Sequence, residues 1–151
     1  MTTIVYDHNA GLVAVDGRCM TGSLINTDSI QKWIKRGDDY WFFAGSLCDR
    51  EAFIDHFLDP NPAKPGFNLE CSAIAVRGGK VYNCIIDQES GKPCAALVEY
   101  NDAMGSGEEF ALAALDHGKT AEDAVAYAAT RDSGTGGKIR VFDVAKMEFI
   151  K

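Results

Sequence analysis

The second residue of the chain is a threonine, and it opens the run Thr2-Thr3-Ile4-Val5. Removal of Met1 would leave Thr2 with a side-chain hydroxyl and a free α-amine on the same residue. The hydroxyl is a nucleophile, and an α-amine with a pKa near ~8 can accept its proton close to neutral pH. The pair predicts nucleophilic catalysis by Thr2, although a small residue after the first methionine is by itself an ordinary feature.

A second group of candidate residues is formed by Asp16 and Lys32. Asp16 ends a short apolar run and is followed by Gly17 and Arg18, whereas Lys32 stands between Ile30 and Ile34 in a segment that we expect to be a strand. A lysine among apolar neighbours is costly unless it is paired, so Asp16 is a sensible partner for it. The alternative is that Lys32 extends its ammonium to solvent.

Glycine-rich turns carry the remaining candidates. Gly45 ends an aromatic strand just before a helix, where backbone N–H groups can point at a developing oxyanion. Ser106, between two glycines, is either a helix cap or a hydroxyl of the site. Asp132 and Thr135 lie in a Gly-rich stretch, 131–137, that joins a helix to a strand, and this stretch is otherwise read as a flexible connection.

Length, charge and cysteine content limit the classes of protein to which the chain can belong. With 151 residues, we expect a single domain spanning 1–151, with a proper hydrophobic core. The net charge of −7 argues against nucleic-acid binding through phosphates, and no apolar run reaches the length of a membrane span. The five cysteines are scattered without metal-ligand spacing, so we expect reduced thiols, no metal site and a cytoplasmic location.

The hydrophobic pattern predicts an α+β fold. Strands are expected at 3–7, 12–16, 40–43, 71–76, 81–87, 94–100, 139–144 and 146–150, with extended segments at 20–27 and 30–36. Helices are expected at 47–58, 107–117 and 120–131, the last with Thr120 as its N-cap, and a proline-rich loop at 59–68. Short turns between consecutive strands favour antiparallel sheets, and two sheets face to face with helices outside would bury every apolar face.

In this order the motifs resemble those of proteasome β-type subunits, and most closely those of HslV peptidases. The resemblance covers nearly the whole chain. Its pieces are Thr2-Thr3-Ile4-Val5, Asp16 with Arg18, Lys32 sixteen positions after Asp16, Phe43-Ala44-Gly45, Gly105-Ser106-Gly107, and Arg131-Asp132 with Thr135-Gly136-Gly137, where threonine stands for the usual serine. No single piece is specific, and the weight of the resemblance lies in their order and spacing.

The resemblance implies an N-terminal nucleophile (Ntn) hydrolase with a four-layer αββα sandwich. Thr2 would be the nucleophile of a threonine endopeptidase, and Lys32, held charged by Asp16, would lower the pKa of the Thr2 amine or hydroxyl. The Gly45 N–H would stabilise the oxyanion. Ser106, Asp132 and Thr135 would hold the α-amine and a water molecule.

The same resemblance implies the surroundings of the site. The substrate pocket would be lined by apolar residues, which predicts cleavage after hydrophobic residues: Cys19, Met20, Ile30, Ile34, Phe43 and Leu47. A monovalent cation near Asp132 and Thr135 is a further expectation, with no other cofactor. The implied partners are further copies in a homo-oligomeric ring, an AAA+ unfoldase ATPase, and protein or peptide substrates.

The sequence departs from the family in its outer helices. Members have two long helices between the Ala-Gly strand and the next hairpin, whereas here only 47–58 reads as helical. We therefore expect a reduced outer helical layer, which leaves ring assembly and ATPase docking open. Two other functions stay open: a small-molecule Ntn amidase on the same scaffold, and a non-catalytic assembly protein that keeps Met1.

Overall fold

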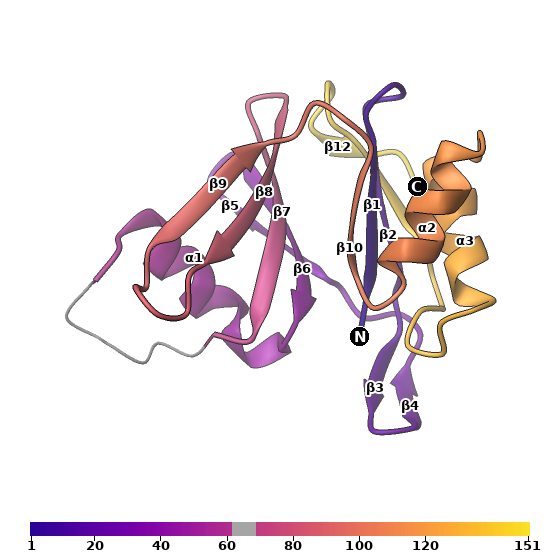
Figure 1. Cartoon of the computed structure of the whole chain (residues 1–151), viewed down its shortest axis with the longest axis horizontal. Helices are drawn as coiled ribbons and strands as arrows, with labels where there is room; N and C mark the ends of the chain where they lie inside the picture. Colours follow the sequence, from indigo (N-terminus) through magenta and orange to yellow (C-terminus); the bar gives the residue numbers. More distant parts are fainter. Residues whose placement is uncertain (62–68) are drawn as a thin grey trace.

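The computed structural model describes residues 1–61 and 69–151, and within them the strands form two five-stranded antiparallel sheets and a separate hairpin (Figure 1). The first sheet has the order β10-β1-β2-β11-β12, from Asp102–Gly105, Thr3–Asp7, Leu12–Val15, Arg140–Asp143 and Glu148–Phe149. The second has the order β5-β6-β7-β8-β9, from Trp33–Arg36, Asp39–Gly45, Cys71–Arg77, Lys80–Ile86 and Pro93–Leu97. The hairpin pairs β3 (Cys19–Thr21) with β4 (Leu24–Thr27).

Helices cover the outer faces of both sheets. Helices α2 (Glu108–Asp116) and α3 (Ala121–Ala129) lie side by side on the first sheet, whereas α1 (Arg50–Leu58), preceded by a 3₁₀ turn at Leu47–Asp49, lies on the second (Figure 1). This is the four-layer αββα sandwich expected from the sequence. In the described residues α1 is the one α-helix of its layer, so that outer layer is reduced, as expected.

Successive side chains of a strand point to opposite faces of the sheet, which explains how each strand contributes to two layers of the core. In β1, Ile4 packs between the sheets, and its neighbour Val5 packs under α2 and α3, because successive strand residues point to opposite faces. In β6, Phe42 faces the other sheet, and Trp41 faces α1. The strands are therefore apolar on both faces, which is why they read as continuous hydrophobic runs.

Local signals set the helix ends. Thr120 caps α3 by accepting a hydrogen bond from the Asp123 N–H at 3.1 Å, which confirms its predicted role. Helix α2 ends at Asp116 and is followed by Gly118 in the left-handed region at φ +88°, a conformation that favours glycine.

The structure corrects several expected elements. Residues 20–27 are not one extended segment, because Gly22 at φ +57° allows the turn between β3 and β4. Lys32 precedes β5 rather than lying within a strand. Strand β10 was missed, although it pairs with β1 from Thr3↔Gly105 to Tyr6↔Asp102. The loop expected at 59–68 is irregular at 59–61, and its remainder lies outside the described residues.

Candidate active site

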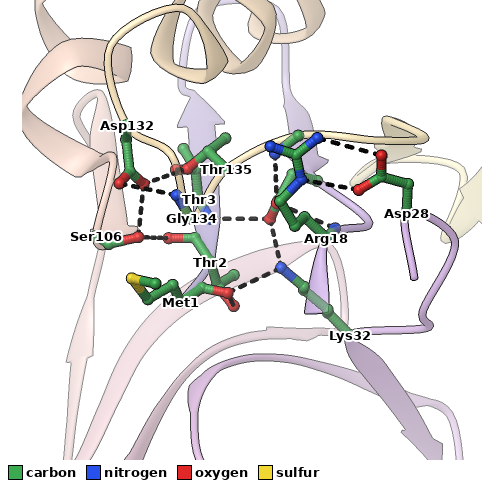
Figure 2. Close-up of polar contacts among 12 residues, drawn as sticks. Met1, Thr2, Thr3, Arg18, Asp28, Lys32, Ser106, Asp132, Gly134 and Thr135 are labelled. Carbon is green, nitrogen blue, oxygen red and sulfur yellow. Dashed lines mark hydrogen bonds and ion pairs between the residues drawn. The ribbon is translucent and has the colours of Figure 1, made fainter. Parts of the chain in front are cut away.

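Two neighbouring threonines stand at the start of β1, and their side chains point in opposite directions (Figure 2). Thr2 precedes the strand, is 4% exposed and borders a cavity. Thr3 is fully buried, and its hydroxyl points away from that cavity toward Thr135. The alternation of side chains therefore gives the two hydroxyls different surroundings.

Asp16 and Lys32 form a buried ion pair beside Thr2. Lys32 Nζ lies 2.7 Å from Asp16 Oδ1, and the two side chains are 3% and 0% exposed, so the pairing expected from the sequence is present. Asp16 also accepts hydrogen bonds from three backbone N–H groups, those of Thr3, Arg18 and Gly136. Burial lowers the pKa of the Lys32 ammonium, and the charge of Asp16 opposes this effect.

The carbonyl oxygen of Met1 connects Lys32 with the hydroxyl of Thr2 (Figure 2). It accepts a hydrogen bond from Lys32 Nζ at 3.1 Å and another from Thr2 Oγ1 at 2.7 Å. A shared acceptor holds the ammonium and the hydroxyl on the same side of β1, next to each other. Lys32 does not face solvent.

A second polar network lies on the other side of Thr2. Ser106 and Thr135 both donate hydrogen bonds to Asp132 Oδ2, each at 2.6 Å, and the Gly134 N–H donates to Asp132 Oδ1 at 3.2 Å. Burial raises the pKa of the Asp132 carboxyl, but the hydrogen bonds that it accepts outweigh burial and hold the pKa below its ordinary value. Ser106 Oγ also lies 3.4 Å from the backbone oxygen of Thr2.

Thr3 extends this network, although the sequence did not single it out. Its hydroxyl lies 2.6 Å from that of Thr135, and because Thr135 donates to Asp132, Thr3 must donate to Thr135. The alternation within β1 was the available signal, since it places a buried hydroxyl on the face that carries α2 and α3.

The two glycines around Ser106 are required by close contacts. A Cβ at Gly105 would lie 2.0 Å from the Thr2 backbone oxygen, and Gly105 has φ +106°. A Cβ at Gly107 would lie 2.2 Å from Thr3 Oγ1. The Gly-Ser-Gly sequence therefore lets the start of α2 approach β1 closely enough for Ser106 to reach Asp132.

Gly45 ends β6 and lies on the wall of the cavity that Thr2 also lines. Its φ of +107° is in the left-handed region, and an added Cβ would lie 2.2 Å from the Glu70 oxygen. The next residue, Ser46, donates its N–H to that same oxygen at 2.7 Å, which fixes the turn.

The cavity beside Thr2 has a volume of about 350 Å³. Four of the six expected pocket residues line it, namely Cys19, Met20, Ile30 and Leu47. Its wall also contains polar side chains that the sequence did not predict as lining: Arg18, Thr21, Asn26 and Ser46.

Ile34 and Phe43 do not line this cavity, so their placement in the substrate pocket is corrected. Both pack in the cluster under α1, where Phe43 is 3% exposed. Ile34 pairs with Trp41, and Phe43 lies two residues further along β6, so all three point to the helix side of the sheet.

Arg18 has a partner that the sequence did not indicate. Its guanidinium binds both carboxylate oxygens of Asp28, at 2.8 and 3.2 Å, and donates to the Ser133 backbone oxygen at 3.2 Å. A Cβ at Gly136 would lie 2.6 Å from this guanidinium. Arg18 therefore ties the 132–136 loop to the segment that leads to Lys32.

No helix in residues 1–61 and 69–151 is long and apolar enough to cross a membrane. In the same residues no three His, Cys, Asp or Glu side chains are grouped so that they could hold a metal ion.

The comparisons with known proteins identify the fold. No family model and no curated protein sequence matches the chain. Among solved structures, the chain is similar to the crystal structure of eukaryotic HslV from Trypanosoma brucei, with a TM-score of 0.69 and 22% sequence identity. The match covers 93% of this chain and 97% of the HslV chain. The chain therefore has the fold of HslV, a four-layer αββα sandwich.

Proposed function

We propose that the chain is a threonine peptidase whose nucleophile is Thr2, exposed as the N-terminal residue after removal of Met1. The observation that carries this proposal is the shared acceptor at Met1, because it places the Thr2 hydroxyl beside the buried Lys32–Asp16 pair. A buried lysine and carboxylate cost desolvation energy and are weak evidence of stability, so their position next to a hydroxyl favours a chemical role.

Removal of Met1 would change the hydrogen bonding of Thr2. With Met1 attached, the Thr2 nitrogen is an amide and its hydroxyl donates to the Met1 oxygen. Once Met1 has gone, that acceptor disappears and the nitrogen becomes an amine that can take the hydroxyl proton, directly or through water. Ser106 and Asp132 would orient the amine, and the positive charge of the present N-terminus already contributes to the lowered pKa of Asp132.

Lys32 and Gly45 would act on the reacting atoms. The space taken by the Met1 oxygen would be open to water or to a substrate carbonyl, and Lys32 Nζ would donate into it. The Thr2 hydroxyl attacks the peptide carbonyl, the amine product leaves, and water hydrolyses the acyl-enzyme. The Gly45 N–H on the cavity wall would stabilise the oxyanion, and one such donor is typically worth about 3 kcal/mol.

The cavity supports a peptide as substrate. Its apolar part, formed by Cys19, Met20, Ile30 and Leu47, suits a hydrophobic side chain at the cleaved bond. Better cleavage of a fluorogenic peptide with a charged residue at the cleaved bond than of one with an apolar residue there would contradict this preference. Assembly into a homo-oligomeric ring, docking of an AAA+ ATPase and a cytoplasmic location are parts of the proposal that rest on the likeness to HslV.

A monovalent cation near Asp132 and Thr135 stays a prediction, because the contacts of these residues do not require one. Both Asp132 oxygens already accept hydrogen bonds from protein groups, and the Thr135 hydroxyl is engaged by Thr3 and Asp132. No step of the proposed reaction uses a metal cation.

One experiment tests the proposal at Thr2 directly. The native protein is analysed by intact mass and N-terminal sequencing, before and after treatment with an epoxyketone or a β-lactone. Loss of Met1 with a single adduct on Thr2 is expected. Retained Met1 with no adduct would instead favour the non-catalytic assembly protein.

Kinetics with matched lysine variants then test the role of Lys32. Lys32→Met should lower kcat/KM for an apolar fluorogenic peptide at least about 100-fold, whereas Lys35→Met, at an exposed position of β5, should leave it nearly unchanged. A monomer that hydrolyses small amides and ignores peptides would point to the amidase alternative.

A further inference from the structure

A second cavity, of about 310 Å³, lies next to the candidate active site. It is formed where the segment before β5 meets the start of β11, and it is lined by Ser29, Ile30, Gln31, Trp33, Lys138 and Arg140. Ile30 lines this cavity and also the one that contains Thr2. The Lys138 N–H donates to the Asp28 backbone oxygen at 2.8 Å, which joins the two walls.

The charge of this cavity is opposite to that of the whole chain. The chain has a net charge of −7, yet the lining contains two cations and no carboxylate. Among the described residues, neither Lys138 nor Arg140 forms an ion pair. Two unpaired cations in one concave site favour an anionic ligand.

Arg140 is held in place without hydrogen-bond partners. Its guanidinium carbon lies 5.6 Å from the Trp33 ring centre and 5.3 Å from that of Phe149. Arg140 Nε is buried and has no hydrogen-bond partner in the described structure. Aromatic contacts can orient a guanidinium but do not satisfy its N–H groups, and a buried unsatisfied donor costs free energy.

We propose that this cavity, defined by Lys138, Arg140 and Trp33, is a subsite for an oxyanion, and that its ligand is a carboxylate of the peptide bound at Thr2. Arg140 would bind the carboxylate through its N–H groups, Lys138 would add a second positive charge, and Ser29 and Gln31 supply further polar groups. Because Ile30 lines both cavities, the two adjoin, and one extended peptide bound at Thr2 would also enter the second cavity. The assignment of the ligand to a substrate rests on the proposed function, whereas the oxyanion chemistry does not.

Trp33 supplies a direct readout of binding. The chain has two tryptophans, and Trp41 is fully buried in the core, so a ligand in this cavity should change the emission of Trp33. The protein used is the full chain with Thr2→Ala, which cannot turn over the peptide. Binding is therefore measured independently of whether the chain is a peptidase.

The probes are blocked apolar peptides with one glutamate placed at each position in turn, their glutamine counterparts, and inorganic phosphate at constant ionic strength. At one position, the glutamate peptide should bind about tenfold more tightly than its glutamine counterpart. Arg140→Gln and Lys138→Gln should each remove most of this preference, and Lys80→Gln, at the exposed start of β8 and outside this cavity, should retain it. Trp33→Phe should abolish the fluorescence change.

The contrary outcomes separate the parts of the proposal. Equal binding of glutamate and glutamine peptides at every position, without phosphate binding, would overturn the subsite altogether. Saturable binding of phosphate alone would uphold an oxyanion site and overturn its assignment to substrate. Lys138 is exposed, so Lys138→Gln tests the charge even if Arg140→Gln impairs folding.

Discussion

The hydroxyl groups of Thr3 and Thr135 lie 2.6 Å apart, although the two residues are 132 positions apart in the chain. This contact fastens the start of β1 to the loop that carries Asp132. Because the Thr135 hydroxyl donates its hydrogen bond to Asp132, Thr3 is the first donor in a chain of hydrogen bonds that ends on the carboxylate.

Thr3→Val should therefore destabilise the protein although it keeps the size of the side chain. It removes the donor and leaves a buried hydroxyl oxygen without its partner, which costs about 1–2 kcal/mol. The free energy of unfolding from denaturant titration measures this. Thr130→Val is the control, since it removes an exposed hydroxyl that donates to the Tyr127 oxygen, and the expected loss is smaller.

Gly107→Ala should destabilise the protein through the same threonine. The added Cβ would lie 2.2 Å from Thr3 Oγ1, and overpacking of this kind typically costs about 1–3 kcal/mol. Thr3→Ala removes the closest atom, so the double variant should lose less stability than the sum of the single variants. Strict additivity in chemical denaturation would show that the close contact is not the cause.

Substitutions of Asp16 and Lys32 should have strongly non-additive effects on the free energy of unfolding. Asp16→Asn and Lys32→Met each leave a buried partner uncompensated, and each is expected to cost about 3–5 kcal/mol. The double variant should be more stable than additivity predicts. The Arg18–Asp28 pair provides the comparison, because the Asp28 side chain is 46% exposed and Asp28→Asn should therefore cost far less stability than either buried substitution. Similar losses for the two pairs would contradict the argument from burial.

Asp132 should contribute to stability in a pH-dependent way. Its pKa is lower in the folded protein than the ordinary value of 3.8, so the unfolded state takes up its proton first as the pH falls. The contribution is complete above this value and is lost as the pH falls through the lowered pKa.

The stability difference between the parent protein and Asp132→Asn should therefore shrink as the pH falls below about 4. Unfolding by urea at a series of pH values measures it, with Asp38→Asn, at an exposed turn position, as the control. A difference that stays constant with pH would mean that the hydrogen bonds at Asp132 do not depend on its charge.

Much of the fold could be predicted because its signals are local. Strands β1 and β2 and the helix α3 with its Thr120 cap follow from hydrophobic pattern and capping chemistry. The pairing of Lys32 with Asp16 could also be inferred, since an apolar environment makes an unpaired lysine costly. The two residues come together because Asp16 directly follows β2 and the segment before β5 passes alongside it, where the Ile30 N–H donates to the Gly17 backbone oxygen.

The features that sequence reasoning missed depend on contacts distant in the chain. Strand β10 consists of Asp102, Ala103, Met104 and Gly105, residues with little β-propensity, and it is extended because it pairs with β1. Ile34 and Phe43 were misplaced because a two-sided apolar sheet does not show in its sequence which face looks toward the site. The partner of Arg18 was missed because nothing local marks Asp28 as that partner.

Because Thr2 and Thr3 point in opposite directions, the number of residues before Ile4 decides which hydroxyl faces the cavity. Strand β1 is paired on both edges, through Thr3↔Gly105 and Ile4↔Val15, so its register cannot shift freely. One extra residue inserted between Thr3 and Ile4 would turn the Thr3 hydroxyl toward the cavity and remove it from its contact with Thr135. Because the proposed reaction also needs a free amine on Thr2, affinity tags on a recombinant protein belong after Lys151.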